Sequence, residues 1–138
     1  MTTNITFIEE ILNIKFPTVY VQFVLNIFDL ENKKFKFAMY DGGYKSNEVI
    51  TFLNFEEQSN DYIVNVCKEE EHLQPNHLIP FARTEWEYDF ICFYFENGRN
   101  QEPKIVYFSF DLYYESLEDS IFHIANSFDE FVHKLDEE

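Results

Sequence analysis

Apolar side chains recur with helical spacing in four segments of the chain. In the C-terminal segment, the residues at positions i, i+3, i+4 and i+7 form one stripe made of Phe128, Phe131, Val132 and Leu135. The same periodicity predicts helices over the ranges Phe7–Asn13, Pro17–Ile27, Asn60–Glu71 and Phe128–Leu135. Each stripe needs an apolar surface to cover.

Two of these helices carry a capping signature at their first turn. Ser127 can accept a hydrogen bond from the backbone N–H of Glu130, and the Glu130 carboxylate can reach back to the N–H of Ser127. Thr6 and Glu9 have the same spacing near the N-terminus. Both helices are therefore predicted to begin at these residues.

From Lys33 onward the period changes to two. Apolar residues alternate with Lys34, Lys36 and Ala38, which is typical of a half-buried strand, and the lysines suit a sheet edge. The glycines of Asp41-Gly42-Gly43 tolerate the backbone angles of a tight turn, and Glu48–Phe55 is predicted to return as the next strand.

Later segments are dense in aromatic and β-branched residues: Leu78–Ala82, Trp86–Phe95 and Lys104–Phe110. Asn97-Gly98 marks a hairpin connection. Phe90–Phe95 is almost wholly apolar, which is expected of a central strand covered on both faces. The pattern predicts an α+β fold in one domain, residues 1–138, with an antiparallel β-sheet flanked by N-terminal helices and a C-terminal helix.

The segment from Asp111 to Ile124 carries two different signals. Ser116 can cap a short helical turn through Asp119, whereas Ile121–Ile124 can be extended.

The chain is strongly acidic, with a formal net charge of −16. Residues 1–84 carry 12 acidic and 7 basic side chains, whereas residues 85–138 carry 14 and 3. This charge argues against binding to nucleic acid or to an anionic membrane, and it favours a basic protein partner. The alternative is that acidity only confers solubility. The run Glu69-Glu70-Glu71, which frays easily at a helix end, is expected to be solvated.

Candidate catalytic or metal-binding chemistry is sparse. Cys67 and Cys92 lie in apolar contexts without ligand spacing, so they are expected to be reduced and buried, and the four histidines show no metal or catalytic motif. Ser127 is better explained as a cap than as a nucleophile. We therefore expect no metal, no cofactor and no enzymatic activity. The N-terminus has no signal pattern and no apolar run is long enough to span a membrane, which predicts a cytoplasmic protein.

Two segments interleave acidic residues with tyrosine and tryptophan, which are enriched among binding hot spots. The predicted partner-binding residues are Glu85, Trp86, Glu87, Tyr88, Asp89, Asp111, Tyr113, Tyr114 and Glu115. Alternatively, Trp86 and Tyr88 face the core from a strand whose other residues are solvated. Tyr113 and Tyr114 are adjacent, so in a strand they cannot both face the core.

Several short motifs follow one another in order along the chain: an amphipathic first helix, Phe16-Pro17…Tyr20, Ile79-Pro80-Phe81-Ala82 and Ala125…Ser127-Phe128…Phe131. In this the chain resembles, nearly end to end, the SUKH superfamily of bacterial immunity proteins, which are related to fungal cell-wall assembly regulators. Two places depart from the family pattern. Phe28–Asn32 replaces an Asn-Gly-Gly, and Arg83–Glu87 replaces a Gly-rich turn.

The resemblance implies an immunity protein, or antitoxin, that binds and neutralises a cognate polymorphic toxin domain by occlusion. Many toxins of this kind are nucleases, whose basic surface would suit an acidic binder. Two alternatives stay open: a non-enzymatic regulatory scaffold that binds another cellular protein, and a small-molecule-binding domain or enzyme. The sequence leaves the toxin and the oligomeric state undetermined.

Overall fold

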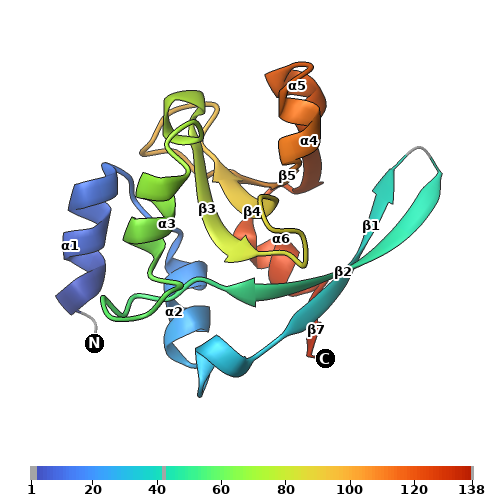
Figure 1. Cartoon of the computed structure of the whole chain (residues 1–138). Helices are drawn as coiled ribbons and strands as arrows, with labels where there is room; N and C mark the ends of the chain where they lie inside the picture. The colour runs from blue at the N-terminus through green and yellow to red at the C-terminus, as the bar shows by residue number, and fades with distance from the viewer. Residues whose placement is uncertain (1–2, 42, 138) are drawn as a thin grey trace.

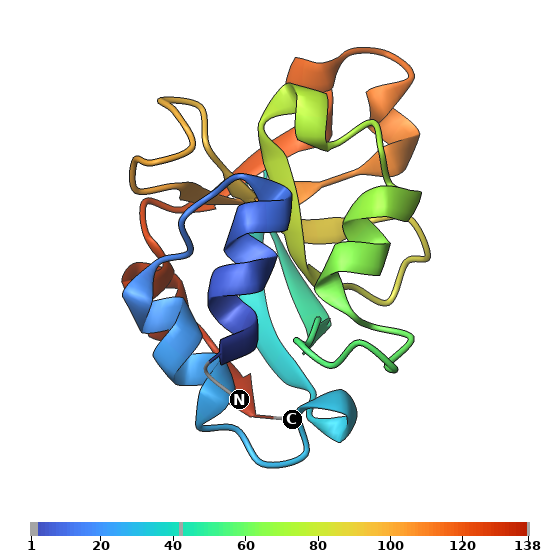
Figure 2. The ribbon, with the colours of Figure 1, turned by 90° about the vertical axis from the view of Figure 1, so that its left-hand side faces the viewer.

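The computed structural model describes residues 3–41 and 43–137 and has an α+β fold, as predicted. Its helices are α1 (Thr3–Leu12), α2 (Thr18–Leu25), α3 (Ile63–Glu69), α4 (Phe110–Tyr113), α5 (Leu117–Ser120) and α6 (Phe128–Val132), with single 3₁₀ turns η1 (Leu30–Asn32) and η2 (Gln74–Asn76). Figure 1 shows α1, α2 and α3 grouped on one side of the molecule, and Figure 2 views it from that side.

The strands of the described part of the chain form one antiparallel sheet in the order β6-β5-β4-β3-β2-β1-β7. Their bounds are β1 (Phe35–Asp41), β2 (Tyr44–Phe52), β3 (Leu78–Arg83), β4 (Phe90–Tyr94), β5 (Lys104–Phe108), β6 (Ile121–Ala125) and β7 (Asp136–Glu137). Neighbours in the sheet are mostly neighbours in sequence, so the meander predicted from the aromatic segments is present.

Helix α1 begins earlier than its capping signature predicted. Thr6 lies inside the helix, which starts at Thr3, so the predicted Thr6 cap is wrong. The reason is Ile5, which is buried with Ile8 and Leu12 and extends the apolar stripe by one turn, whereas Ile11 is 42% exposed.

The first two strands form the predicted hairpin, in which Asp41 pairs with Tyr44. Gly43 has a φ of 89°, a conformation that favours glycine, while Gly42 lies outside the described residues. Strand β1 forms the sheet edge that its lysines suggested over only part of its length, since residues 37–41 pair with β2 alone within the described chain. The short strand β7 pairs with Phe35 and Lys36, and Lys33 forms an ion pair with Glu137.

Strands β3, β4 and β5 are buried along almost their whole length. Phe93 contacts the ring of Tyr20 in α2, with centroids 4.9 Å apart. Phe108 pairs with Phe90, which lies three residues from Phe93 and therefore on the opposite face of the sheet. There Phe108 contacts His72, whose ring centroid is 5.6 Å away. The central strands are covered on both faces, as their composition predicted.

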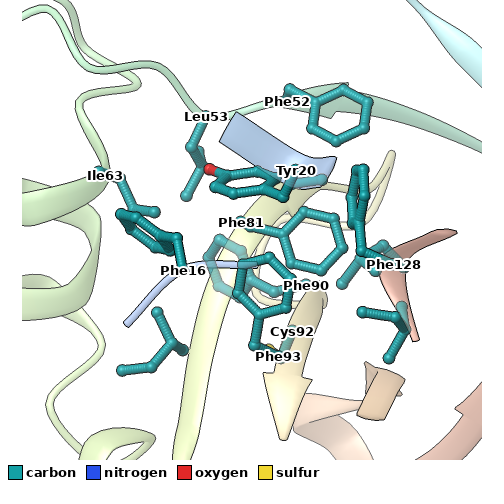
Figure 3. Packing of buried hydrophobic residues seen from close by; sticks show 14 of the residues in the cluster. Phe16, Tyr20, Phe52, Leu53, Ile63, Phe81, Phe90, Cys92, Phe93 and Phe128 are labelled. Atoms are coloured by element: carbon teal, nitrogen blue, oxygen red, sulfur yellow. The ribbon is translucent and has the colours of Figure 1, made fainter. Parts of the chain in front are cut away.

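The core is built around Tyr20 (Figure 3). Its ring packs against Phe55, Phe81 and Phe128, at centroid distances between 5.2 and 6.0 Å. The Tyr20 hydroxyl is buried and has no hydrogen-bond partner among the described residues, and burial raises the pKa of Tyr20 well above 10.0. Cys67 and Cys92 are buried as expected, and burial raises the pKa of the Cys67 thiol to about 12.

The C-terminal segment follows its predicted capping pattern in part. Ser127 accepts a hydrogen bond from the Glu130 N–H at 3.1 Å, but the Glu130 carboxylate accepts from the N–H of Asn126 instead of Ser127. Phe128 and Phe131 are fully buried. Ser116 caps α5 by accepting from the Asp119 N–H at 3.0 Å, and β6 follows directly.

Candidate functional site

The loop between β3 and β4 holds the first predicted binding segment. It was expected to be a strand from Trp86 onward, but β4 begins only at Phe90. The Thr84 Oγ1 accepts a hydrogen bond from the Trp86 N–H at 3.0 Å and donates to the Asp89 carbonyl oxygen at 3.1 Å, so the chain turns back on itself. Trp86 is 67% exposed and Tyr88 is 49% exposed. The alternative in which both rings face the core is therefore wrong.

Asp89 joins this loop to the second predicted segment, which forms helix α4. Its Oδ1 accepts from the Phe110 N–H at 2.9 Å, and its Oδ2 accepts from the Tyr107 hydroxyl at 2.7 Å. Phe110 is the first residue of α4, where backbone N–H groups lack partners within the helix. Burial, followed by the contact with Asp89, raises the pKa of Tyr107 far above 10.0. Asp89 is half-buried, and both oxygens of its carboxylate already accept hydrogen bonds within the chain. It therefore holds the two segments together.

The aromatic side chains of the two segments form a continuous group. The ring of Phe110 lies between Tyr88 and Tyr114, with both centroid distances 5.2 Å. Tyr113 turns inward and packs against Phe108, while Tyr114 is 77% exposed. This division arises because successive residues of a helix point about 100° apart, and not from the strand alternation that the sequence suggested.

Together these residues form one surface, which we call the acidic–aromatic face. It consists of Glu85, Trp86, Glu87, Tyr88 and Asp89 from the loop, with Phe110, Asp111, Tyr113, Tyr114 and Glu115 from α4 and its C-terminal end. The carboxylates of Glu85, Glu87, Asp111 and Glu115 belong to exposed residues. The structure therefore brings the two predicted segments together.

The C-terminal end of α3 adds residues that the sequence analysis did not place here. Glu70 lies close enough to Tyr88 that its charge, after that of Glu87, raises the pKa of the phenol. Burial, and then the neighbouring Glu69, raises the pKa of Glu70, whose Oε1 has no hydrogen-bond partner among the described residues. The expectation that this acidic run is wholly solvated is wrong for Glu70. The fold alone reveals it, because α3 and the loop are distant in sequence.

His72 is a further addition beneath this surface. Its ring packs against Phe110 and Tyr113, with centroids 5.7 and 5.2 Å away, and burial lowers its pKa. Its Nε2 is buried and has no partner in the part of the chain that the structure describes. No sequence motif marked this histidine, because its neighbours come from β5 and α4.

Between the two segments lies a shallow pocket of about 140 Å³, bordered by the side chains of Trp86, Glu87, Tyr88, Phe110 and Asp111. Aromatic faces and carboxylates both attract cations, so this hollow suits a lysine or arginine head group. It is smaller than the roughly 300–1,000 Å³ typical of small-molecule sites.

Within residues 3–41 and 43–137, no three histidine, cysteine or carboxylate side chains come together to hold a metal ion. No helix there combines the length and the apolar character that a membrane crossing requires.

The comparisons with known proteins agree with the motifs along the chain. No curated protein and no solved structure matches the sequence significantly. The model of the SMI1 / KNR4 family (SUKH-1) matches residues 2–134, nearly the whole chain. This match confirms the predicted relationship, and the chain belongs to the SMI1 / KNR4 (SUKH-1) family.

Proposed function

We propose that this protein is a bacterial immunity protein that neutralises a cognate toxin domain by covering it with the acidic–aromatic face. Proteins of the SUKH group are generally non-enzymatic immunity or regulatory proteins, and membership is consistent with this role. The observation that carries the proposal is the joining of the two segments by Asp89, beside which Trp86, Tyr88 and Tyr114 lie at the surface among exposed carboxylates.

The chemistry of this face favours a basic protein. Exposed aromatic side chains supply contact area at low entropic cost, and the surrounding carboxylates speed the approach of a positively charged partner. A nuclease toxin must present positive charge to phosphates, so a surface of this kind can occupy the substrate path. The net charge of −16 extends the attraction beyond the contact itself.

Co-expression with the product of the immediately adjacent gene tests the proposal. A stable complex and the rescue of growth would support immunity. Replacing Glu85, Glu87 and Asp111 by lysine should slow association, and the effect should shrink as salt rises, because exposed charges are screened within about 10 Å. The control variant has the same charge change at Glu10, Glu57 and Glu102, which are exposed residues outside the face.

Two results would contradict the proposal. If the adjacent product is not toxic and the protein instead binds a resident cellular protein, the regulatory-scaffold function replaces immunity. If both lysine variants associate equally slowly, the effect comes from net charge alone and the face is not the interface.

A further inference from the structure

A second surface lies in the turn between α2 and β1, where the sequence departs from the usual family pattern. Phe28 is 89% exposed, the highest value for a large apolar side chain in the described ranges. Residues flanking it in sequence line a pocket of about 360 Å³ between α2, η1 and the segment after β2. The volume of this pocket is within the range of binding pockets, and the neighbouring Phe28 ring is exposed. A pocket beside an exposed aromatic ring is typical of a docking surface.

The pocket has an apolar floor and an acidic rim. Val24 and Phe55 contribute to the floor and are buried, whereas Asp29, Glu31 and Glu56 supply carboxylates at the rim and are exposed. A long basic side chain matches both parts, because its methylene stem packs on apolar surface while its charged head group meets carboxylates.

Two of the rim carboxylates are held in place by neutral amides. The Asn32 Nδ2 donates to both carboxylate oxygens of Asp29, at 3.0 and 3.1 Å. The Asn54 Nδ2 donates to the Glu31 Oε1 at 3.3 Å, and Asn54 itself is only 4% exposed. Its Oδ1 accepts from the Glu56 N–H at 3.1 Å, which fixes the backbone at the third carboxylate. Such preorganisation lowers the entropic cost of binding.

The rim charges are not neutralised within the described chain. The ion pairs there join Lys15 to Glu9, Lys33 to Glu137, Arg83 to Asp61 and Lys104 to Glu96. None of them involves Asp29, Glu31 or Glu56. The pocket therefore keeps its negative charge available to a cation that comes from outside the chain.

We propose that this pocket docks a basic segment of a partner protein, with one arginine or lysine side chain seated on its floor and an adjacent apolar side chain covering Phe28. Figures 1 and 2 show the turn between α2 and β1 at the opposite end of the molecule from α4 and α5. This surface is thus separate from the acidic–aromatic face, and the inference does not depend on the immunity function.

An NMR titration of the ¹⁵N-labelled full chain tests the proposal. The probes are the peptides acetyl-Leu-Arg-Leu-amide and acetyl-Leu-Gln-Leu-amide. The arginine peptide should shift the backbone amides of Phe28, Leu30 and Glu31 and the side-chain amide of Asn54, and the glutamine peptide should not. The double substitution Glu31→Gln and Glu56→Gln should weaken the arginine peptide at this pocket by about tenfold, because it removes two charges but keeps the hydrogen-bonding shape.

The matched control is Glu10→Gln with Glu57→Gln, which removes the same number of charges at exposed residues that do not line the pocket and should bind as the unchanged protein does. The proposal would be overturned if the arginine peptide caused the same NMR shifts in the variant with Glu31→Gln and Glu56→Gln, or if its shifts were spread evenly over all acidic surfaces. It would also be overturned if sedimentation showed that the protein self-associates and that Phe28→Ser abolishes this association, because the occupant would then be a second copy of this chain.

Discussion

Replacing Asp89 by alanine is the sharpest test of how the acidic–aromatic face is built. The substitution leaves the Phe110 N–H and the buried Tyr107 side chain without their common acceptor. A buried donor left unpaired costs about 1–3 kcal/mol. The free energy of unfolding should therefore fall by about 2–5 kcal/mol, with the lower end expected if water reaches the half-buried Phe110.

A double-mutant cycle separates the two hydrogen bonds. Tyr107→Phe removes the hydroxyl but leaves Asp89 bonded to Phe110, so it should cost about 1 kcal/mol. In the Asp89→Ala background the same change should cost almost nothing, because its acceptor is already gone. The expected coupling energy is therefore about 1 kcal/mol.

Urea denaturation supplies these energies. Fluorescence of Trp86, the sole tryptophan, reports on the loop, while far-ultraviolet circular dichroism reports on the whole fold. In the variant the loop signal should change before the global one. A cost of less than about 1 kcal/mol for Asp89→Ala, or strictly additive losses in the cycle, would refute the role assigned to this carboxylate.

Four further substitutions probe the core, the aromatic group and the half-buried Glu70. Phe131→Ala should lower the free energy of unfolding by about 3–5 kcal/mol, since the ring is fully buried. A near-zero change in this free energy, measured by urea denaturation, would show that the ring does not belong to the core. Tyr113→Ala should lower the free energy of unfolding by about 1–3 kcal/mol, because the ring packs inward. Tyr114→Ala should leave the free energy of unfolding unchanged, because the ring is exposed, and should raise the dissociation rate of the partner by a factor that corresponds to about 2 kcal/mol. The reverse result in unfolding and surface-binding assays would contradict the inward and outward orientations. Burial, and then Glu69, raise the pKa of Glu70 above 4.5, so the folded state loses stability as pH rises through the raised pKa. Glu70→Gln should therefore be more stable than the unchanged protein at pH 7, by a margin that solvent screening of this half-buried group keeps small, and equally stable below about pH 4. A constant difference across this range in urea denaturation would exclude titration as the cause.

Hydrophobic periodicity was enough to predict the parts of the fold that pack directly against the core. The stripe of α6, the meander and the doubly covered central strands depend on burial, and burial leaves a repeating pattern in sequence. The Ser127 and Ser116 caps were likewise predictable, because a cap and its partner lie within one turn.

The misassigned parts depend on contacts between residues distant in sequence. Strand β7 has only two residues and no pattern of its own, and its place follows from pairing with β1. Trp86 and Tyr88 read as alternate residues of a strand, but Thr84 and Asp89 form a turn at that point. Local pattern cannot anticipate a hydrogen bond from Phe110 to Asp89, which are 21 residues apart.

This distinction affects how binding data on the face should be interpreted. Its nine predicted residues include two that act through the fold, since Asp89 holds the loop to α4 and Tyr113 packs inward. An alanine scan would report both as binding residues, because truncation includes the cost of rearranging the free protein. Exposed carboxylates such as Glu87 should instead change mainly the association rate, leaving stability intact. Stability measured alongside binding therefore separates residues that touch a partner from those that position others.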